Sequence, residues 1–118
     1  MEEALTVLVR HRPEFALVTV AGEVDLTTAP LLRVRLTELA ATGGPLVVDL
    51  SRVRFIDAAG LGALAHVASL ATVYGGSLHV VTAQPRVRML LSISGLERHV
   101  GLAWTVREAA SDLGGEAR

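Results

Sequence analysis

The sequence contains no cysteine and few aromatic residues, and its charges nearly cancel. The absence of cysteine excludes disulfides, thiol nucleophiles and thiolate metal sites. Eleven Lys and Arg residues against twelve Asp and Glu residues give a formal net charge of -1, and an aromatic content of 3% provides no platform on which bases could stack. Nucleic-acid binding is therefore not expected.

Membrane-spanning runs are also missing, although 51% of the residues are hydrophobic. A stretch without Asp, Glu, Lys or Arg, 58–76, contains His66, Ser69, Thr72 and several glycines, so it is a poor transmembrane segment. The first residues, MEEALTVLVR, resemble neither a signal peptide nor a transit peptide. We therefore expect a cytoplasmic protein that does not bind membranes.

Alternating apolar residues predict two strands at the start of the chain, 5–9 and 15–20, joined by a hairpin turn at 11–14. Leucines at helical spacing then predict an amphipathic helix over 29–41. Thr27 or Thr28 is the expected N-cap of this helix, because either hydroxyl could accept a hydrogen bond from a free backbone N–H.

The rest of the chain alternates between short apolar runs and helical patterns. The runs 46–50 and 77–82 lack the period-2 pattern of a half-exposed strand, which is typical of strands buried on both faces of a parallel sheet. Helices are expected at 58–74, 85–93 and 106–113, and a last edge strand at 102–104.

The predicted order, β-β-α-β-α-β-α-β-α, describes one α/β domain with a mixed sheet of about four or five strands and about four helices. The domain is expected to occupy residues 1–118, with its core at about 4–113 and a frayed tail at 114–118.

The segment FIDAAGLGAL, residues 55–64, contains the most informative turn of the sequence. Asp57 precedes a predicted helix and is expected to cap it, which typically stabilises a helix by about 1 kcal/mol. Gly60 and Gly62 have no side chain, so another backbone or a partner protein can come close to the helix there. A capped helix start with small residues explains most of the pattern without any partner. The residues of the following helix therefore decide between a purely structural turn and a partner-binding turn.

That helix carries no charged residue over its whole length. One predicted stripe faces the core (Leu61, Leu64, Ala65, Ala68 and Ala71), and a second forms an outer strip (Ala59, Ala63, Val67, Leu70 and Tyr74). A helix that covers a sheet normally presents charge to solvent, so this helix is either fully buried or covered by another protein. We favour a partner surface, because so small a domain rarely encloses a helix; a homodimer through the same strip is an alternative.

The segments VVDLSRVRFIDAAGLGAL, GEVDLTTAP and GGSLHVVTAQPRVRMLLSISGLERHV together resemble the STAS family of bacterial anti-sigma factor antagonists. The family pattern is a hydrophobic strand, Asp-Leu-Ser, a short loop, then Phe-[Ile/Met/Cys]-Asp-Ser-[Ser/Ala]-Gly-Leu and a helix. The resemblance runs over nearly the whole chain. It implies a protein-interaction module that is not an enzyme and whose partner is an anti-sigma factor, a histidine-kinase-like ATPase.

The resemblance also implies a partner-binding surface formed by the predicted turn and the following helix: Asp25, Asp57, Ala58, Ala59, Gly60, Leu61, Ala63 and Val67. In partner switching, the kinase phosphorylates a hydroxyl residue in this turn. The dianionic phosphate, placed at a packed apolar interface beside an acid, then drives release of the antagonist.

The phosphoacceptor position of the family falls on Ala59, and the preceding position, often Ser, is Ala58. Neither residue has a hydroxyl, so phosphorylation in the turn is chemically impossible; Ser51 and Ser69 are poorly placed substitutes. Three explanations stay open: a constitutively binding antagonist, a STAS scaffold or adaptor with another partner, or a chain engineered to resist phosphorylation.

The remaining polar residues give no enzymatic motif. Asp25 is interpreted either as a partner contact or as a turn-forming residue, whereas Asp49 is interpreted as structural. The histidines show no metal-binding spacing, and no phosphate-binding loop is present, so neither a metal nor a cofactor is expected. A small-ligand or nucleotide site at the helix N-terminus is a further alternative, because free backbone amides attract anions there.

Overall fold

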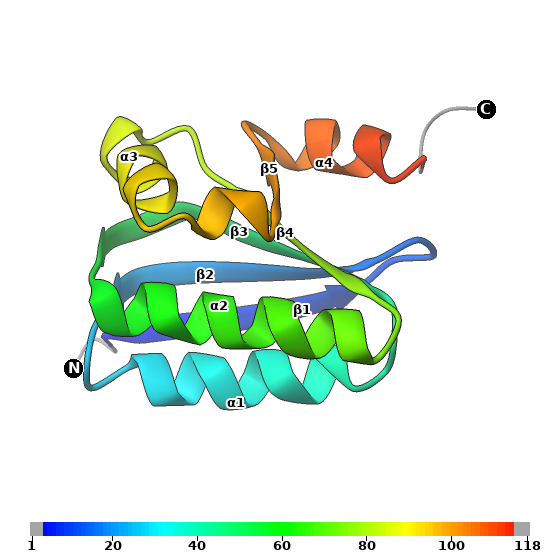
Figure 1. Ribbon diagram of the computed structural model, residues 1–118, viewed down its shortest axis with the longest axis horizontal. Coiled ribbons are helices and arrows are strands. Elements are labelled where there is room, and N and C mark those ends of the chain that lie inside the picture. The colour runs from blue at the N-terminus through cyan, green and yellow to red at the C-terminus, as the bar shows by residue number, and fades with distance from the viewer. Residues whose placement is uncertain (1–3, 115–118) are drawn as a thin grey trace.

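The computed structural model describes residues 4–114, which form a five-stranded sheet with helices on both faces (Figure 1). The elements follow the predicted order: β1 (Leu5–His11), β2 (Ala16–Val24), α1 (Ala29–Ala40), β3 (Pro45–Ile56), α2 (Ala58–Val73), β4 (Ser77–Val81), α3 (Pro85–Ile93), β5 (Gly101–Ala103) and α4 (Val106–Asp112). A short 3-10 helix, η1 (Leu96–Arg98), was not predicted. The predicted frayed tail lies outside the described residues, apart from Gly114.

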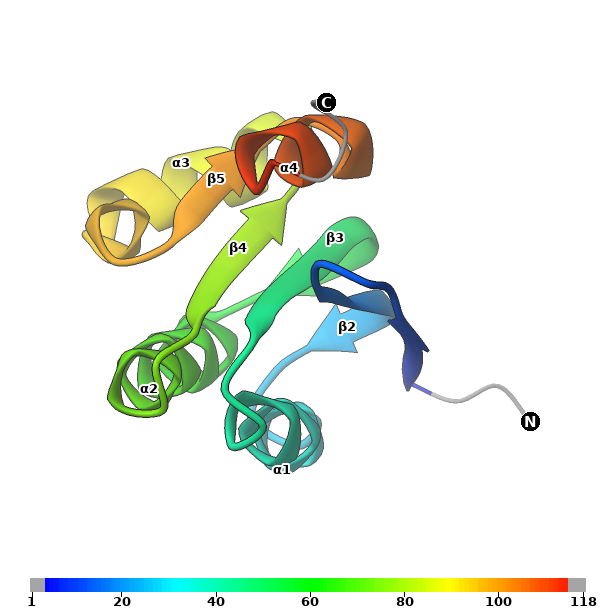
Figure 2. The ribbon, with the colours of Figure 1, turned by 90° about the vertical axis from the view of Figure 1, so that its right-hand side faces the viewer.

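The strands lie in the order β1-β2-β3-β4-β5. The hairpin makes β1 and β2 antiparallel, and every later pair is parallel, so the predicted mixed sheet is confirmed. Helices α1 and α2 lie side by side on one face of the sheet, and α4 covers the opposite face near β5 (Figure 2). No helix within residues 4–114 is long and apolar enough to cross a membrane.

Strands β3 and β4 are buried on both faces, as their unbroken apolar sequences predicted. Val48 and Val80 belong to the large core under α1 and α2, whereas Val47 and Val81 belong to a smaller core under α4. Each large aliphatic side chain that is fully buried in this way contributes about 1.5–3 kcal/mol of transfer free energy.

Strands β2 and β3 run further than the sequence predicted. The prediction ended them at residues 20 and 50, but they continue as a parallel pair to Val24 and Ile56, with register irregularities between Thr19 and Ala21 and between Gly22 and Glu23. Both irregularities place an extra residue in β3, so the buried residues of its extension, Leu50, Val53 and Ile56, recur every three residues and give no strand-like alternation. Val24 pairs with Ile56 at the carboxyl ends of the two parallel strands. The residues that follow, Asp25 and Asp57, therefore lie at the same end of the sheet.

Candidate functional site

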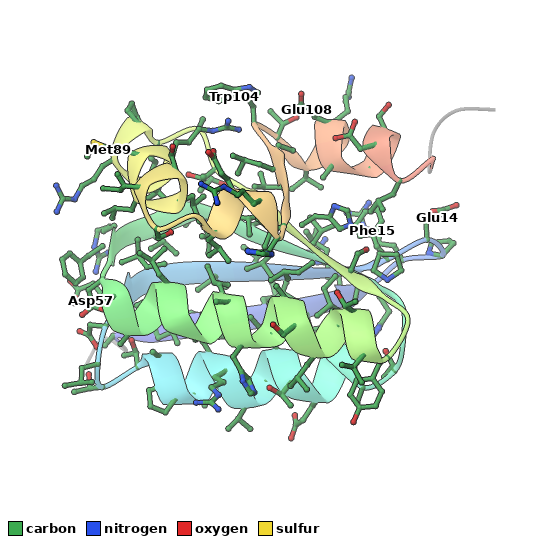
Figure 3. All side chains as sticks on the ribbon, in the orientation of Figure 1. Glu14, Phe15, Asp57, Met89, Trp104 and Glu108 are labelled. Atoms are coloured by element: carbon green, nitrogen blue, oxygen red, sulfur yellow. The ribbon has the colours of Figure 1, made fainter. Side chains whose placement is uncertain are left out.

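Asp57 caps α2 as predicted. Its backbone is extended (φ -120°, ψ -169°), and its Oδ1 accepts hydrogen bonds from the amides of Ala59 at 2.9 Å and Gly60 at 3.2 Å. The Asp57 amide donates to the carbonyl oxygen of Val24 at 3.2 Å, which fixes the turn to the end of β2. Figure 3 shows Asp57 at the first turn of α2. The carboxylate thus already occupies donors that a bound anion would need, and the small-ligand alternative finds no support here.

The two glycines of the turn have different roles. A Cβ at Gly60 would lie 2.7 Å from Cγ1 of Ile56 and 2.7 Å from Cγ1 of Val24, so a glycine is required for α2 to pack on the strand ends. A Cβ at Gly62 would meet nothing within 4 Å. Gly60 is therefore a packing residue, whereas Gly62 leaves an open notch on the helix surface.

The exposed surface over the first nine residues of α2, 58–66, carries no Asp, Glu, Lys or Arg. Ala58, Gly62, Ala65 and His66 are exposed, and Ala59 and Leu61 are half-buried. Titratable groups other than His66 are absent from this part of the helix. The structure therefore leaves an exposed surface without Asp, Glu, Lys or Arg at the start of the helix, but the residues that form it are not those of the predicted outer strip.

The predicted outer strip was wrong at two positions. Ala63 is 4% exposed and Val67 is fully buried, so neither forms part of an exposed strip on this surface. Conversely, Ala65 was expected in the core but is exposed. The reason is that α2 packs against the sheet and also against α1, so two of its sides are buried. Of the other strip residues, Leu70 is half-buried and Tyr74 is exposed.

Two grooves flank this exposed start of α2, and Gly62 lines both of them. The groove toward α1 has a volume of about 760 Å³ and is lined by Leu26, Ala29, Pro30, Arg33, Val34, Thr37, Glu38, Ala59, Gly62, Ala63 and His66. The groove toward η1 has a volume of about 450 Å³ and is lined by Ala58, Leu61, Gly62, Ala65, Ser94, Gly95, Leu96, Arg98 and His99. Ala58 and Ala59 thus face different grooves.

Asp25 organises the loop between β2 and α1. Its Oδ1 accepts hydrogen bonds from the Thr27 hydroxyl at 2.8 Å and from the Thr28 amide at 3.1 Å. These bonds, led by the one from the Thr27 hydroxyl, lower the pKa of Asp25 below its ordinary value. Thr28 is the N-cap residue, but its hydroxyl does not cap α1; it donates to the Glu23 carbonyl oxygen at 2.8 Å.

The other acids near the turn have structural partners. Glu23 forms an exposed ion pair with Arg54 at 3.7 Å. Asp49 accepts hydrogen bonds from the amide and the hydroxyl of Ser51, which accords with its structural interpretation. Within residues 4–114, no group of three or more His, Cys, Asp and Glu side chains is arranged to hold a metal ion.

Sequence reasoning missed three residues of this surface, Leu26, Ser94 and Arg98. Leu26 directly follows Asp25 and is 76% exposed beside the α1 groove. An isolated apolar residue in a polar loop was the available signal. Ser94 and Arg98 line the other groove, and no local pattern connects them with the turn, because the β4–α3–β5 crossover brings them there.

Comparison with known proteins identifies the family. The STAS domain model matches residues 6–109, so the chain belongs to the STAS domain family. The anti-sigma-B factor antagonist of Bacillus subtilis (strain 168) is 36% identical over 80 residues, which are 68% of this chain and 73% of that protein. The anti-sigma F factor antagonist of Paenibacillus polymyxa is 29% identical over 94 residues, or 78% and 80% of the two chains.

A solved structure agrees with these relatives. An anti-sigma factor antagonist from Mycobacterium paratuberculosis superposes with a TM-score of 0.85 and 31% sequence identity, over 93% of this chain and 94% of that one. The α/β fold predicted from the order of elements and the family indicated by the three segments together are therefore confirmed, and the named relatives are antagonists of anti-sigma factors.

Proposed function

We propose that this protein is an anti-sigma factor antagonist that binds its anti-sigma factor through the Asp57 turn and the exposed start of α2. The observation that carries the proposal is an uncharged, partly apolar ridge, bordered by two grooves, at the start of the helix. Such a surface costs little to desolvate, and its grooves offer concave sites for partner side chains. Leu26 extends the apolar area on one side, and Leu61 contributes on the other.

We further propose that binding is not switched off by phosphorylation in the turn. Ala59 stands at the phosphoacceptor position of the family pattern and has no hydroxyl. Its amide donates to the Asp57 carboxylate, so a negative group on its side chain would lie close to an existing negative charge. In this chain the complex would be regulated by the amounts of the two proteins. The proposed partner is a histidine-kinase-like ATPase, and the proposed site of action is the cytoplasm.

The experiment uses the anti-sigma factor encoded nearest to this protein's own gene, with binding followed by isothermal titration calorimetry. Ala59→Glu adds a charge beside Asp57 and should weaken the complex roughly tenfold to hundredfold, at about 1.4 kcal/mol for each tenfold. Ala59→Ser is the matched neutral control and should bind like the unmodified chain. With ATP present, only Ala59→Ser should gain a phosphate and then dissociate.

Two results would contradict the proposal. If the unmodified chain does not bind the kinase-like protein, the adaptor interpretation gains support instead. If it binds but Ala59→Glu has unchanged affinity, the turn is not the contact.

A further inference from the structure

The groove between α2 and η1 carries positive charge, and no acidic residue lines it. Arg98 is its one permanently charged residue, and His99 is either neutral or cationic. The groove toward α1 differs, because Glu38 lines it together with Arg33 and offsets that charge. The two sides of the exposed start of α2 therefore differ in electrostatic character.

Arg98 has no counterion within the described residues, 4–114. Its side chain is exposed and forms neither an ion pair nor a hydrogen bond with any of them. The neighbouring acid, Glu97, does not line the groove. Its carboxylate instead accepts a hydrogen bond at 3.2 Å from the hydroxyl of Ser92 on α3. The guanidinium of Arg98 is therefore free to pair with a group from outside the chain.

The groove is continuous with the exposed start of α2. One wall is α2 from Ala58 to Ala65, and the other is the segment 94–99 around η1 (orange in Figure 1). The half-buried Leu61 and the buried Leu96 add apolar surface to it. The α2 wall is about 10 Å long, at 1.5 Å per residue. This length matches about three residues of an extended chain.

A partner that covers this groove has to neutralise Arg98, because a guanidinium that is taken out of water without a counterion is strongly destabilising. A carboxylate is the matching group, since its two oxygens can accept two parallel N–H bonds from the guanidinium. A Lys or Arg side chain in the same place would be repelled by Arg98. The groove therefore selects an acidic occupant.

We propose that the groove between α2 and η1 receives an acidic segment of the anti-sigma factor, with one carboxylate of that segment paired to Arg98. The inference rests on the proposed function and adds the chemistry of the partner's contact. Ala58 and Gly62 belong both to the exposed start of α2 and to this groove, so a partner bound at the Asp57 turn lies next to Arg98. An apolar side chain of the same segment would pack against Leu61.

The first test is calorimetry with the anti-sigma factor encoded nearest to this protein's own gene. Arg98→Glu reverses the charge and should weaken the complex roughly tenfold to hundredfold. Arg98→Gln should weaken it less and should make the affinity less sensitive to salt. Arg107→Glu is the matched control, because Arg107 is an exposed arginine on α4, on the opposite face of the sheet, and its reversal changes the net charge equally. It should bind like the unmodified chain.

The second test uses the absence of lysine from the sequence. Arg98→Lys introduces a single side-chain amine, and it lies at the groove. In the complex, a carbodiimide should couple this amine to a carboxylate of the anti-sigma factor, and mass spectrometry of the digested product should identify the Asp or Glu. Arg107→Lys, treated in the same way, should give no coupled peptide through residue 107.

The inference and the proposed function fail in different ways. If Ala59→Glu weakens the complex but Arg98→Glu does not, the inference is overturned and the proposed function stands. An equal loss in Arg107→Glu, or no coupling through residue 98, would also overturn the inference alone. If the unmodified chain does not bind the anti-sigma factor, both are overturned. Circular dichroism and the urea midpoint should show that the Arg98 variants fold normally, because the side chain has no contact partner to lose.

Discussion

Substituting alanine at Gly60 or at Gly62 should change stability in opposite directions, although the two positions lie within one helical turn. At Gly60, the new Cβ would lie 2.7 Å from two γ-carbons, those of Val24 and Ile56, and 3.0 Å from the Val24 carbonyl oxygen. The carbonyl belongs to a strand and cannot retreat without disturbing the β2–β3 pair. Overpacking of this kind costs about 1–3 kcal/mol.

At Gly62 the new methyl group meets open space, so only helix propensity changes. Alanine is favoured over glycine in a helix interior by about 0.8–1 kcal/mol. The free energies of unfolding of Gly60→Ala and Gly62→Ala should therefore differ by roughly 2–4 kcal/mol, with the unmodified chain between them. The melting temperatures should differ by roughly 8–16 °C, at about 4 °C for each kcal/mol in a domain of this size.

Urea unfolding followed by circular dichroism measures both variants, and comparable m-values would show that the same folded state is compared. If Gly60→Ala proves as stable as the unmodified chain, α2 does not pack on the strand ends as described. If Gly62→Ala is strongly destabilised, that position is not an open notch.

Three further predictions concern stability. Asp57→Ala removes the cap that two amides share and should cost about 1 kcal/mol in urea unfolding, whereas Asp57→Ser should recover most of the loss. Burial lowers the pKa of His79 below its ordinary value of 6.5, with Asp112 opposing the shift, so the unfolded chain binds the proton more readily. The contribution of neutral His79 to the free energy of unfolding should be complete above pH 6.5 and should decrease as the pH drops below that value. In urea unfolding measured between pH 8 and 5, His79→Gln should reduce this dependence of the unfolding free energy on pH. The Arg88 guanidinium lies 3.4 Å from the ring centre of Trp104. Trp104→Leu should therefore lower the free energy of unfolding by about 0.5–1 kcal/mol, and an unchanged urea midpoint would show that the stacked pair does not stabilise the fold.

The order of elements could be predicted from the sequence because each local signal agreed with the fold. Asp57 was identified as a cap from its position before an apolar helix, and α3 was predicted with both its observed ends. The extension of β3 to Ile56 could not be predicted, because Ser51, Arg52 and Arg54 give a polar sequence that is stabilised only by pairing with β2. Tertiary hydrogen bonding there overrides local composition.

The faces of α2 illustrate a different limit. A helix without charges gives no amphipathic pattern, so the sequence could not show which side touches α1. Val67 proved to be fully buried in the large core, while Ala65 is exposed. The grooves beside Gly62 form only because α1 and η1 lie next to α2. No local sequence pattern predicts these positions.

The most direct test of the interaction surface is to place one charge at two points along the exposed side of α2. Gly62→Glu fills the notch between the grooves without a clash, and Ser69→Glu places the same charge about two turns further along the helix. Calorimetry with the anti-sigma factor should show that Gly62→Glu loses binding while Ser69→Glu binds like the unmodified chain. Equal affinity of both variants and the unmodified chain would contradict an interface at the start of α2.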